Sequence, residues 1–399
     1  MNKLLFVCYG SGHVRMVLPV ARALRNRRLA EVAVLALTTA AAEAQAAGFP
    51  VLRFKDFVDP VADAAALAHG RRLVTGLQQV VDPEESIAYL GMSYADLEDE
   101  VGPKEAARRY ARDGRQAFLP RRSLRRLLGA IRPQLVVATN SPRAERAAIE
   151  AAGELGIPAV CLVDLFAIDE VRWIAQPGYA QHVCVLNEQV RALLLAAGRR
   201  PDEVVVTGNP AFDALRDPAL ASQGRELRTA RGWAGKRVLL WPTQVEPALH
   251  PFDGRQGDPG LPERALQSLV QWTLRQPDAI LCVRPRPGEA APALPADRRI
   301  VLTGQDWPLV PLLHAVDVVV TLSSTVGLEG HLAGARLVQV RGSVFEDAMP
   351  LARFGIADAA VPLDGLTAAL DRWSHAGRRP PRQGENATER VLSVLHPFL

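Results

Sequence analysis

The sequence contains few cysteines, and none is placed for a metal site or a disulfide scaffold. Four cysteines stand far apart in apolar, strand-like segments: Cys8, Cys161, Cys184 and Cys282. Zinc sites and small secreted scaffolds need closely spaced cysteines, such as CxxC pairs. We therefore expect reduced cysteines that lie in the protein core.

The sequence also lacks a long apolar run. Its longest candidates, VVVTL from residue 318 and ILCV from residue 280, are strand-sized, whereas a membrane span needs ~20 apolar residues. The amino terminus, MNKLLFVCYGSGH, has one short apolar run that ends at a glycine turn. Because a secretory signal needs a longer run and a small-residue cleavage site, we predict a first strand there and a cytoplasmic protein.

The charge pattern argues against nucleic-acid binding. The net charge is +4, and basic residues gather in two clusters: Arg25, Arg27 and Arg28, and then Arg121, Arg122, Arg125 and Arg126. No aromatic residues interleave with these arginines, and no recognition motif accompanies them. We interpret the clusters as solvated helix faces. The alternative is peripheral contact with anionic lipid headgroups at the inner membrane face.

Length and rhythm predict two domains. A chain of 399 residues exceeds the ~250–300 residues at which single hydrophobic cores stop growing. Short apolar runs alternate with helical patterns in two successive series, which predicts βαβ units around parallel sheets. We predict an α/β protein with two Rossmann-like, doubly wound domains, residues 1–200 and 201–399, that face each other across a cleft. Residues 56–128 break the rhythm and predict a helical insertion in the first domain.

The first candidate site is the turn Gly10-Ser11-Gly12-His13, which follows the first strand and precedes a helix. Glycine lets the backbone approach a ligand, and helix-start amides attract anionic oxygen. Open α/β sheets bind ligands at the carboxyl ends of their strands, where His13 stands. Histidine is the usual general base near neutral pH. We predict that His13 is catalytic and that Gly12 binds ligand beside it; a structural histidine is the alternative.

The second candidate site is the segment TGNPAFD, residues 207–213, which follows the strand VVV and opens a helix. Gly208 and the exposed amides around it suit a diphosphate. A tight turn capped by Asn209 and reinforced by Pro210 is compatible with that role. We predict that Gly208 and Asn209 bind phosphate.

The third candidate site is SSTVGLE, residues 323–329, at the end of a strand and the start of a helix. The hydroxyls of Ser323, Ser324 and Thr325 and the free helix-start amides suit phosphate. Glu329, one turn later, can accept two hydrogen bonds from ribose hydroxyls. Helix capping alone is the alternative.

Two further loops follow strands of the second series. The loop after RVLLW carries Gln244 and Glu246, and the loop after AILCV carries Arg284 and Arg286. Arginine forms bidentate contacts with phosphate, so we predict that both arginines clamp a diphosphate or a carboxylate. Gln244 and Glu246 are predicted to bind the same ligand, and a solvated loop is the alternative for the arginines.

Taken in order, GSGH, VVVTGNPAFDAL and LSSTVGLEGHLAGARLVQV resemble the GT-B superfamily. That superfamily holds bacterial glycosyltransferases, the non-hydrolysing UDP-N-acetylglucosamine 2-epimerases, and the CMP-sugar and CDP-glycerol transferases of surface-polymer synthesis. The resemblance covers most of the chain, and its carboxyl-terminal motif is the most specific. It implies that the second domain holds a nucleotide-sugar donor and the first domain an acceptor, with the helical insertion as an acceptor surface, a lid or an oligomer contact.

The resemblance also implies roles for single residues. Ser323, Ser324 and Thr325 match the residues that hold donor phosphate, and Glu329 matches the residue that holds ribose. His13 matches the histidine of the lipid II-forming N-acetylglucosaminyltransferase and would lie near the transferred sugar. The implied activity is sugar transfer to a glycan or lipid-linked acceptor in surface polysaccharide or glycoconjugate synthesis, without a metal or other cofactor.

Departures from the superfamily patterns separate its members. The epimerases begin with Gly-Thr-Arg-Pro-Glu instead of GSGH and carry a His-Val-Glu-Ala-Gly segment; Glu145 and Asp164 stand near that region but outside the motif. Sialyl- and Kdo-type transferases carry His-Pro where this chain has Arg286-Pro287. A glycosyltransferase is therefore the preferred interpretation, an epimerase the second, and a non-catalytic nucleotide-sugar binder the third.

Overall fold

A computed structural model describes residues 2–10, 12–75, 82–251, 253–286, 288–304, 306–380 and 385–399. Ser11 of the first turn, Pro287 of the Arg-Pro pair and residues 76–81 of the predicted insertion lie outside these described residues. The chain divides into two compact units: residues 1–211 together with 385–399, and residues 212–384.

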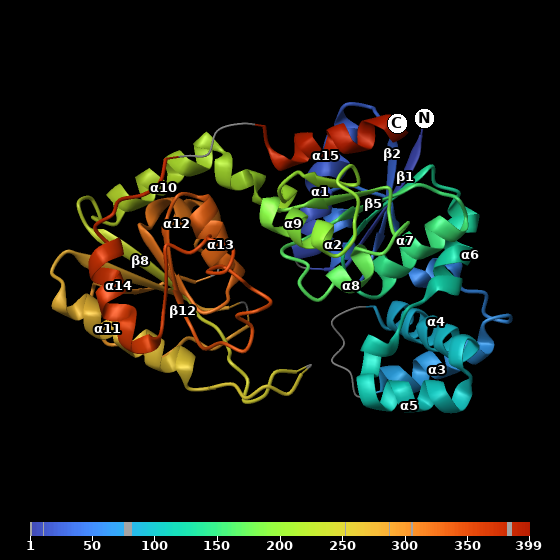
Figure 1. Cartoon of the computed structure of the whole chain (residues 1–399), viewed down its shortest axis with the longest axis horizontal. Helices are drawn as coiled ribbons and strands as arrows, with labels where there is room; N and C mark the ends of the chain where they lie inside the picture. Colours follow the sequence, from blue (N-terminus) through green and yellow to red (C-terminus); the bar gives the residue numbers. More distant parts are fainter. Residues whose placement is uncertain are drawn as a thin grey trace. The chain divides into compact units, whose positions relative to one another are not determined.

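The first unit is built on one parallel sheet (Figure 1). The strand order of this sheet is β3-β2-β1-β4-β5-β6-β7. Its strands are β1 (Lys3–Cys8), β2 (Glu31–Ala36), β3 (Val51–Leu52), β4 (Leu135–Thr139), β5 (Ala159–Leu162), β6 (His182–Val185) and β7 (Val204–Val206). Strand β1 pairs with β2 on one side and β4 on the other. The order therefore reverses next to β1, as in a doubly wound sheet.

The helices of the first unit cover the sheet and extend beyond it. They are α1 (Gly12–Asn26), α2 (Ala40–Ala46), η1 (Phe54–Phe57), α3 (Ala64–Val74), α4 (Pro83–Val101), α5 (Pro103–Asp113), η2 (Gly114–Ala117), α6 (Arg121–Ile131), α7 (Ala144–Glu154), α8 (Val171–Ile174), α9 (Glu188–Ala196), α15 (Ala387–Leu395) and η5 (His396–Phe398). Helix α1 buries an apolar stripe that includes Val17, Ala21 and Leu24 against the sheet.

Helix α15 completes the core of the first unit although it lies at the far end of the sequence. It packs on α1, and Val391, Leu392 and Leu395 join the buried cluster of β1, β2 and α1. The sequence-based boundary at residue 200 differs from this division in two ways: β7 pairs with β6 in the first sheet, and residues 385–399 return to the first unit. Both differences arise from packing between segments that are distant in sequence.

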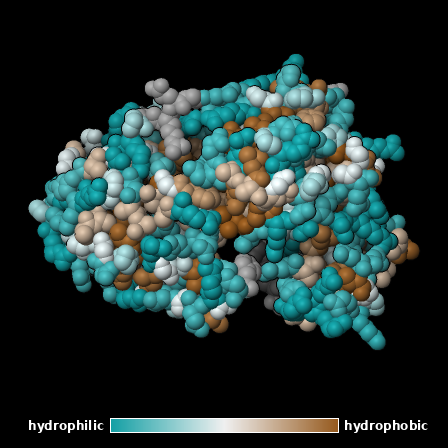
Figure 2. All heavy atoms as spheres, viewed as in Figure 1, coloured by the Kyte–Doolittle hydropathy of each residue, from teal (hydrophilic) through white to brown (hydrophobic). Residues whose placement is uncertain are grey.

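Helices α3, α4 and α5 form the helical segment predicted near residues 56–128. Helices α3 and α4 pack closely because two glycines face the partner backbone: a Cβ on Gly70 would lie 2.0 Å from the Ile87 carbonyl oxygen, and one on Gly91 would lie 2.2 Å from that of Ala66. Hydrophilic residues dominate the visible surface over α5 (Figure 2). The segment is therefore a small helical layer of its own rather than a cover for the sheet.

The second unit has a parallel sheet with strand order β10-β9-β8-β11-β12-β13. Its elements are η3 (Pro210–Arg216), α10 (Pro218–Ala230), β8 (Arg237–Pro242), α11 (Leu261–Arg275), β9 (Ala279–Arg284), β10 (Ile300–Leu302), α12 (Leu309–Ala315), β11 (Val318–Thr321), α13 (Thr325–Leu332), β12 (Arg336–Val340), β13 (Ala359–Val361), η4 (Leu363–Gly365) and α14 (Leu366–Trp373). The element η3 begins at the last two residues of the first unit. The predicted α/β class with two parallel sheets is confirmed.

The core of the second unit lies between its sheet and helices α11 and α14. Trp241 of β8 and Trp272 of α11 are 1% exposed. The Trp272 indole Nε1 donates a hydrogen bond to Asp371 of α14 at 2.7 Å, which satisfies the polar edge of a buried ring.

Two expectations about cysteines and membranes can be compared with the structure. All four cysteines are free and buried, as predicted. Among the described residues, no helix has the length and apolarity needed to cross a membrane.

Candidate functional site

In the first unit, candidate residues gather where the strand order reverses. Strands β1 and β4 are neighbours in the sheet. Helix α1 follows the carboxyl end of β1, and helix α7 follows that of β4. Parallel sheets bind ligands in the crevice at such a switch point. His13, in the first turn of α1, lies half-buried at this edge and contacts Thr139, the last residue of β4.

His13 stands at one end of a short chain of hydrogen bonds. Its Nδ1 lies 2.9 Å from the Thr139 hydroxyl, and that hydroxyl donates to the Glu145 carboxylate at 3.3 Å. When Glu145 is ionised, the single hydroxyl proton of Thr139 goes to its carboxylate, and Thr139 accepts from His13. The proton of the imidazole is then on Nδ1, and Nε2 is left with the lone pair that a general base uses.

Glu145 is the buried end of this chain. Its side chain is 0% exposed, and burial raises the pKa of its carboxyl above the usual range, while nearby His13 opposes that shift. A buried carboxylate beside an imidazole stabilises the imidazolium form once the ring takes a proton. The arrangement therefore suits a histidine that accepts a proton during a reaction.

Asp164 lies on the other side of the first turn. A Cβ on Gly12 would lie 3.4 Å from an Asp164 carboxylate oxygen. The Asp164 backbone amide donates to Asn140 at 2.9 Å, and the amide nitrogen of Asn209 donates to the Asp164 backbone carbonyl at 2.6 Å and to its carboxylate at 3.1 Å. Asp164 is therefore held by Asn140 and Asn209 beside Gly12, the residue that precedes His13.

Glu170 is a further acid in this region that motif reasoning missed. Burial raises the pKa of its carboxyl, and both His13 and Asp164 interact with it electrostatically. It precedes the one-turn helix α8, and its sequence neighbours form no pattern that marks a site. Only the fold brings it near His13.

The structure corrects the placement of Gly208 and Asn209. We predicted them within the second domain, but both follow β7, the last strand of the first sheet. Gly208 adopts a φ of +80°, a conformation that favours glycine, and Asn209 is 2% exposed and holds Asp164. The turn interpretation of this segment accounts for both residues.

In the second unit, the strand order reverses between β8 and β11. Two of the predicted residues, Gln244 and Ser323, are hydrogen-bonded to each other there. Gln244 follows β8, and its side-chain oxygen accepts from the Ser323 backbone amide at 2.7 Å and from the Thr321 hydroxyl at 3.3 Å. Gln244 thus joins the loop after β8 to the loop after β11. This hydrogen bond engages the Ser323 backbone amide, which we predicted to be available for phosphate.

The start of α13 also lies at this carboxyl-terminal edge of the sheet. The Ser324 hydroxyl accepts from the Val326 amide at 3.2 Å and so caps the helix. Thr325 is exposed at the first helical position, and Glu329 is partly exposed one turn later. Ser324 therefore has the capping role, and phosphate binding by Thr325 stays a prediction.

Glu246 has a structural role in the same loop. It is 3% exposed, and its two carboxylate oxygens accept from the Ser343 hydroxyl at 2.8 Å and from the Val344 amide at 2.6 Å. Ser343 in turn lies 3.4 Å from the Ser323 hydroxyl. Glu246 therefore positions the loop after β12 against the site, a contact that we could not foresee from the sequence.

The two predicted arginines differ in their surroundings. Arg284 donates to the carbonyls of Gly304 at 3.2 Å and Trp307 at 3.0 Å; burial lowers its pKa, and Glu329 opposes that shift. Arg286 is exposed, and within the described part of the chain its side chain has no hydrogen bond or ion pair. Arg286 is therefore the better placed of the two to meet a phosphate.

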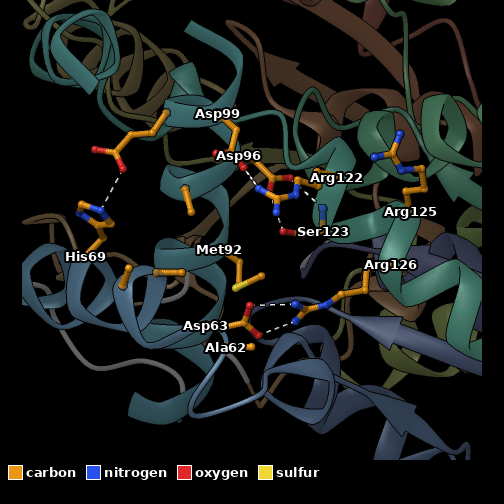
Figure 3. Close-up of a pocket in the computed structure, with 14 residues that line it drawn as sticks. Ala62, Asp63, His69, Met92, Asp96, Asp99, Arg122, Ser123, Arg125 and Arg126 are labelled. Carbon is orange, nitrogen blue, oxygen red and sulfur yellow. Dashed lines mark hydrogen bonds and ion pairs between the residues drawn. The ribbon is translucent and has the colours of Figure 1, made fainter. Parts of the chain in front are cut away.

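A separate cavity of about 460 Å³ lies among α3, α4 and α6 (Figure 3). Its charged side chains face one another: Arg126 pairs with Asp63 at 2.7 Å, and His69 with Glu98 at 3.0 Å. Three arginines of the predicted basic cluster on α6 belong to this lining, namely Arg122, Arg125 and Arg126. These three and Arg121 all have carboxylate partners. These charges are therefore paired within the protein, and the ion pairs join α6 to the helical segment.

The other basic cluster, at the end of α1, also has internal partners. Arg25 donates to the carbonyls of Ala47 and Gly48, and Arg27 pairs with Glu389 of α15. These contacts agree with the helix-face interpretation. Across the described ranges, no three side chains of His, Cys, Asp or Glu gather in a way that could hold a metal ion.

Comparison with known proteins gives likeness in structure alone. No protein-family model and no curated protein match the sequence. A UDP-GlcNAc 2-epimerase from Neisseria meningitidis, bound to UDP-GlcNAc, is similar at 13% identity and a TM-score of 0.59, over 99% of this chain and 100% of that one. MnaA of S. aureus, solved with UDP, is similar at 14% identity and a TM-score of 0.58, over 100% and 97%.

A glycosyltransferase is also among the similar structures. The glycotransferase of kitacinnamycin has 15% identity and a TM-score of 0.52, over 100% of this chain and 94% of that one. At such identities the likeness establishes the fold and not the reaction. The chain has the GT-B type of α/β fold, which epimerases and glycosyltransferases of nucleotide sugars share, as the sequence motifs predicted.

Proposed function

We propose that the chain is a glycosyltransferase that moves a sugar from a nucleotide-sugar donor to a glycan or lipid-linked acceptor in bacterial surface polysaccharide or glycoconjugate synthesis. The observation that carries this proposal is the hydrogen-bonded chain from His13 through Thr139 to Glu145. It places an imidazole at the carboxyl edge of the first sheet, and among the described residues only its Nδ1 makes a hydrogen bond. A transferase needs such a base to activate the acceptor hydroxyl.

In this proposal the second unit holds the donor. The phosphates lie at the start of α13 against Thr325, Glu329 accepts from the ribose hydroxyls, and Arg286 offsets the charge of the leaving nucleotide. His13 takes the acceptor proton while the acceptor oxygen bonds to the anomeric carbon. The bond from that carbon to the donor phosphate breaks, and the nucleotide leaves with the electron pair.

An epimerase is the second candidate, and one observation favours it. Glu170 and Asp164 place two carboxyl groups near His13, and inversion at C2 of a sugar requires removal of one proton and return of another. The similar epimerase structures have the same fold. The test below separates the two reactions.

We expect the protein to leave UDP-N-acetylglucosamine unepimerised. In D2O, inversion at C2 must break the C2–H bond, so an epimerase replaces that hydrogen with deuterium and forms the manno isomer. A transferase without acceptor does neither and at most releases the nucleotide slowly to water. Proton NMR of the sugar over time reads both changes, and rapid appearance of the manno isomer would overturn the transferase proposal.

Glu329→Ala should weaken binding of the donor nucleotide by roughly 1.5–3 kcal/mol, because hydrogen bonds to a charged acceptor are worth that much. The donor is first identified by thermal shift, since a ligand at 100 times its dissociation constant adds about 2.7 kcal/mol of stability. Calorimetric titration then compares the variant with Glu263→Ala, which removes an exposed carboxylate from α11 of the same unit. Equal affinity in wild type and a folded Glu329→Ala protein would refute the ribose role.

A further inference from the structure

A second cavity in the second unit, of about 560 Å³, lies at the opposite edge of the sheet from the donor loops. It is bounded by α10, by the ends of α12 and α13, and by residues 378–379. Helices α12 and α13 end just before β11 and β12, so the cavity adjoins the amino-terminal edge of the sheet. Ser323 and Thr325 stand at the carboxyl-terminal edge.

Close packing of α10 on α12 shapes this cavity (Figure 1). A Cβ on Gly224 would lie 2.4 Å from the His314 Cβ and 2.7 Å from the Pro311 carbonyl oxygen. Glycine at this position therefore allows α10 to approach α12. The next residue, Arg225, is then brought to the rim of the cavity.

The lining is rich in positive charge and contains no acid. It includes five arginines: Arg216, Arg225, Arg228, Arg378 and Arg379. Two of them are neutralised from outside the lining, since Arg228 pairs with Asp317 at 2.8 Å and Arg379 pairs with Asp358. Arg225 and Arg378 contribute positive charge to the lining beyond these two pairs.

Part of this charge is structural. Arg378 donates to the carbonyls of Leu313, Val316 and Ala333 at the ends of α12 and α13, where free carbonyls concentrate negative potential. Burial lowers the pKa of Arg378 to about 10, so it stays charged at neutral pH. Its charge offsets those helix ends.

Arg225 has no such role. It is exposed, and among the residues that the structure describes its side chain makes no hydrogen bond or ion pair. It lines the cavity together with the apolar residues Leu215, Leu332 and Ala333. Guanidinium groups bind phosphate with paired hydrogen bonds, and an apolar wall suits the organic part of such a ligand.

We infer that this cavity binds a small organic phosphate, with the phosphate on Arg225 and its neighbouring arginines and the apolar part against Leu215 and Leu332. Leu215 follows the first passage of the chain between the two units, and Arg379 precedes the second. The site is separate from the donor loops and does not depend on the proposed reaction.

Calorimetric titration of the full chain with phenyl phosphate, inorganic phosphate and pyrophosphate tests the inference. We expect phenyl phosphate to bind more tightly than inorganic phosphate, because only the former has an apolar part. Arg225→Glu should weaken phenyl phosphate at least about tenfold, since it reverses an arginine charge at the phosphate. Arg275→Glu, the same charge change at the exposed end of α11, should leave affinity within about twofold.

A further variant distinguishes binding in this cavity from binding at the donor loops. Thr325→Glu puts a negative charge at the start of α13 and should leave phenyl phosphate binding intact, whatever it does to nucleotide binding. Melting temperatures confirm that each variant is folded. Wild-type affinity in a folded Arg225→Glu protein, or loss of phenyl phosphate binding in Thr325→Glu alone, overturns the inference.

Discussion

His13→Ala should lower turnover by about 10²–10⁴, the range expected when a general base is removed, while nucleotide affinity stays nearly unchanged. Binding and turnover separate because the proposed nucleotide site belongs to the other unit, whereas His13 belongs to the first. Turnover with the identified donor and calorimetric affinity for its nucleotide are measured on one preparation. The effect is expected on kcat rather than on donor KM.

His396→Ala is the matched control, since it removes an exposed histidine of the first unit, far along the chain from the site. Thr139→Val tests the hydrogen-bonded chain itself: it keeps the side-chain volume but removes the hydroxyl between His13 and Glu145. It should lower turnover less than His13→Ala and alter its pH profile. A stable His13→Ala protein with wild-type turnover would exclude His13 from catalysis.

Leu395→Ala should lower the free energy of unfolding by about 2–5 kcal/mol, as expected for truncation of a fully buried leucine. Leu395 is 0% exposed and lies in the cluster formed by β1, β2 and α1. The loss would show that the carboxyl-terminal helix is part of the first unit's core. Chemical denaturation followed by circular dichroism provides the measurement.

Ser393→Ala on the same helix is the control. Its side chain is exposed and bonds only to the Glu389 carbonyl, so a change within about 0.5 kcal/mol is expected. If Leu395→Ala is as mild as this control, α15 contributes little to the core. That result would contradict the packing described above.

The sequence was informative where local pattern decides structure. Buried strands such as KLLFVC and RVLLWP are continuous apolar runs, because parallel strands are covered on both faces. Their order along the chain, with helices between, was enough to predict two parallel sheets. The ends of β1, β8 and β11 then identified His13 at the carboxyl-terminal edge of the first sheet, and Gln244 and Ser323 at that of the second.

Sequence patterns could not predict the contacts between segments that are distant in the chain. Glu246 is an acid in a loop after a strand, as a ligand-binding residue would be. Its carboxylate instead accepts a hydrogen bond from Ser343, which lies almost a hundred residues away in the sequence. Asn209 similarly holds Asp164 across the sheet edge. Glu170 lacks any motif and was found only through the fold. A pattern reports which residues end a strand, but it does not report which of them are already bonded to each other.

The passage of the chain between its two units has a consequence for synthesis on the ribosome. The second unit is one continuous stretch, residues 212–384, whereas the first needs residues 385–399 to finish its core. Because domains emerge in order from the amino terminus, the first unit begins to form first and closes last. A nascent chain that stalls before Leu395 therefore exposes the apolar surface of α1 that α15 covers, and chaperones that recognise such surfaces would meet it at that stage.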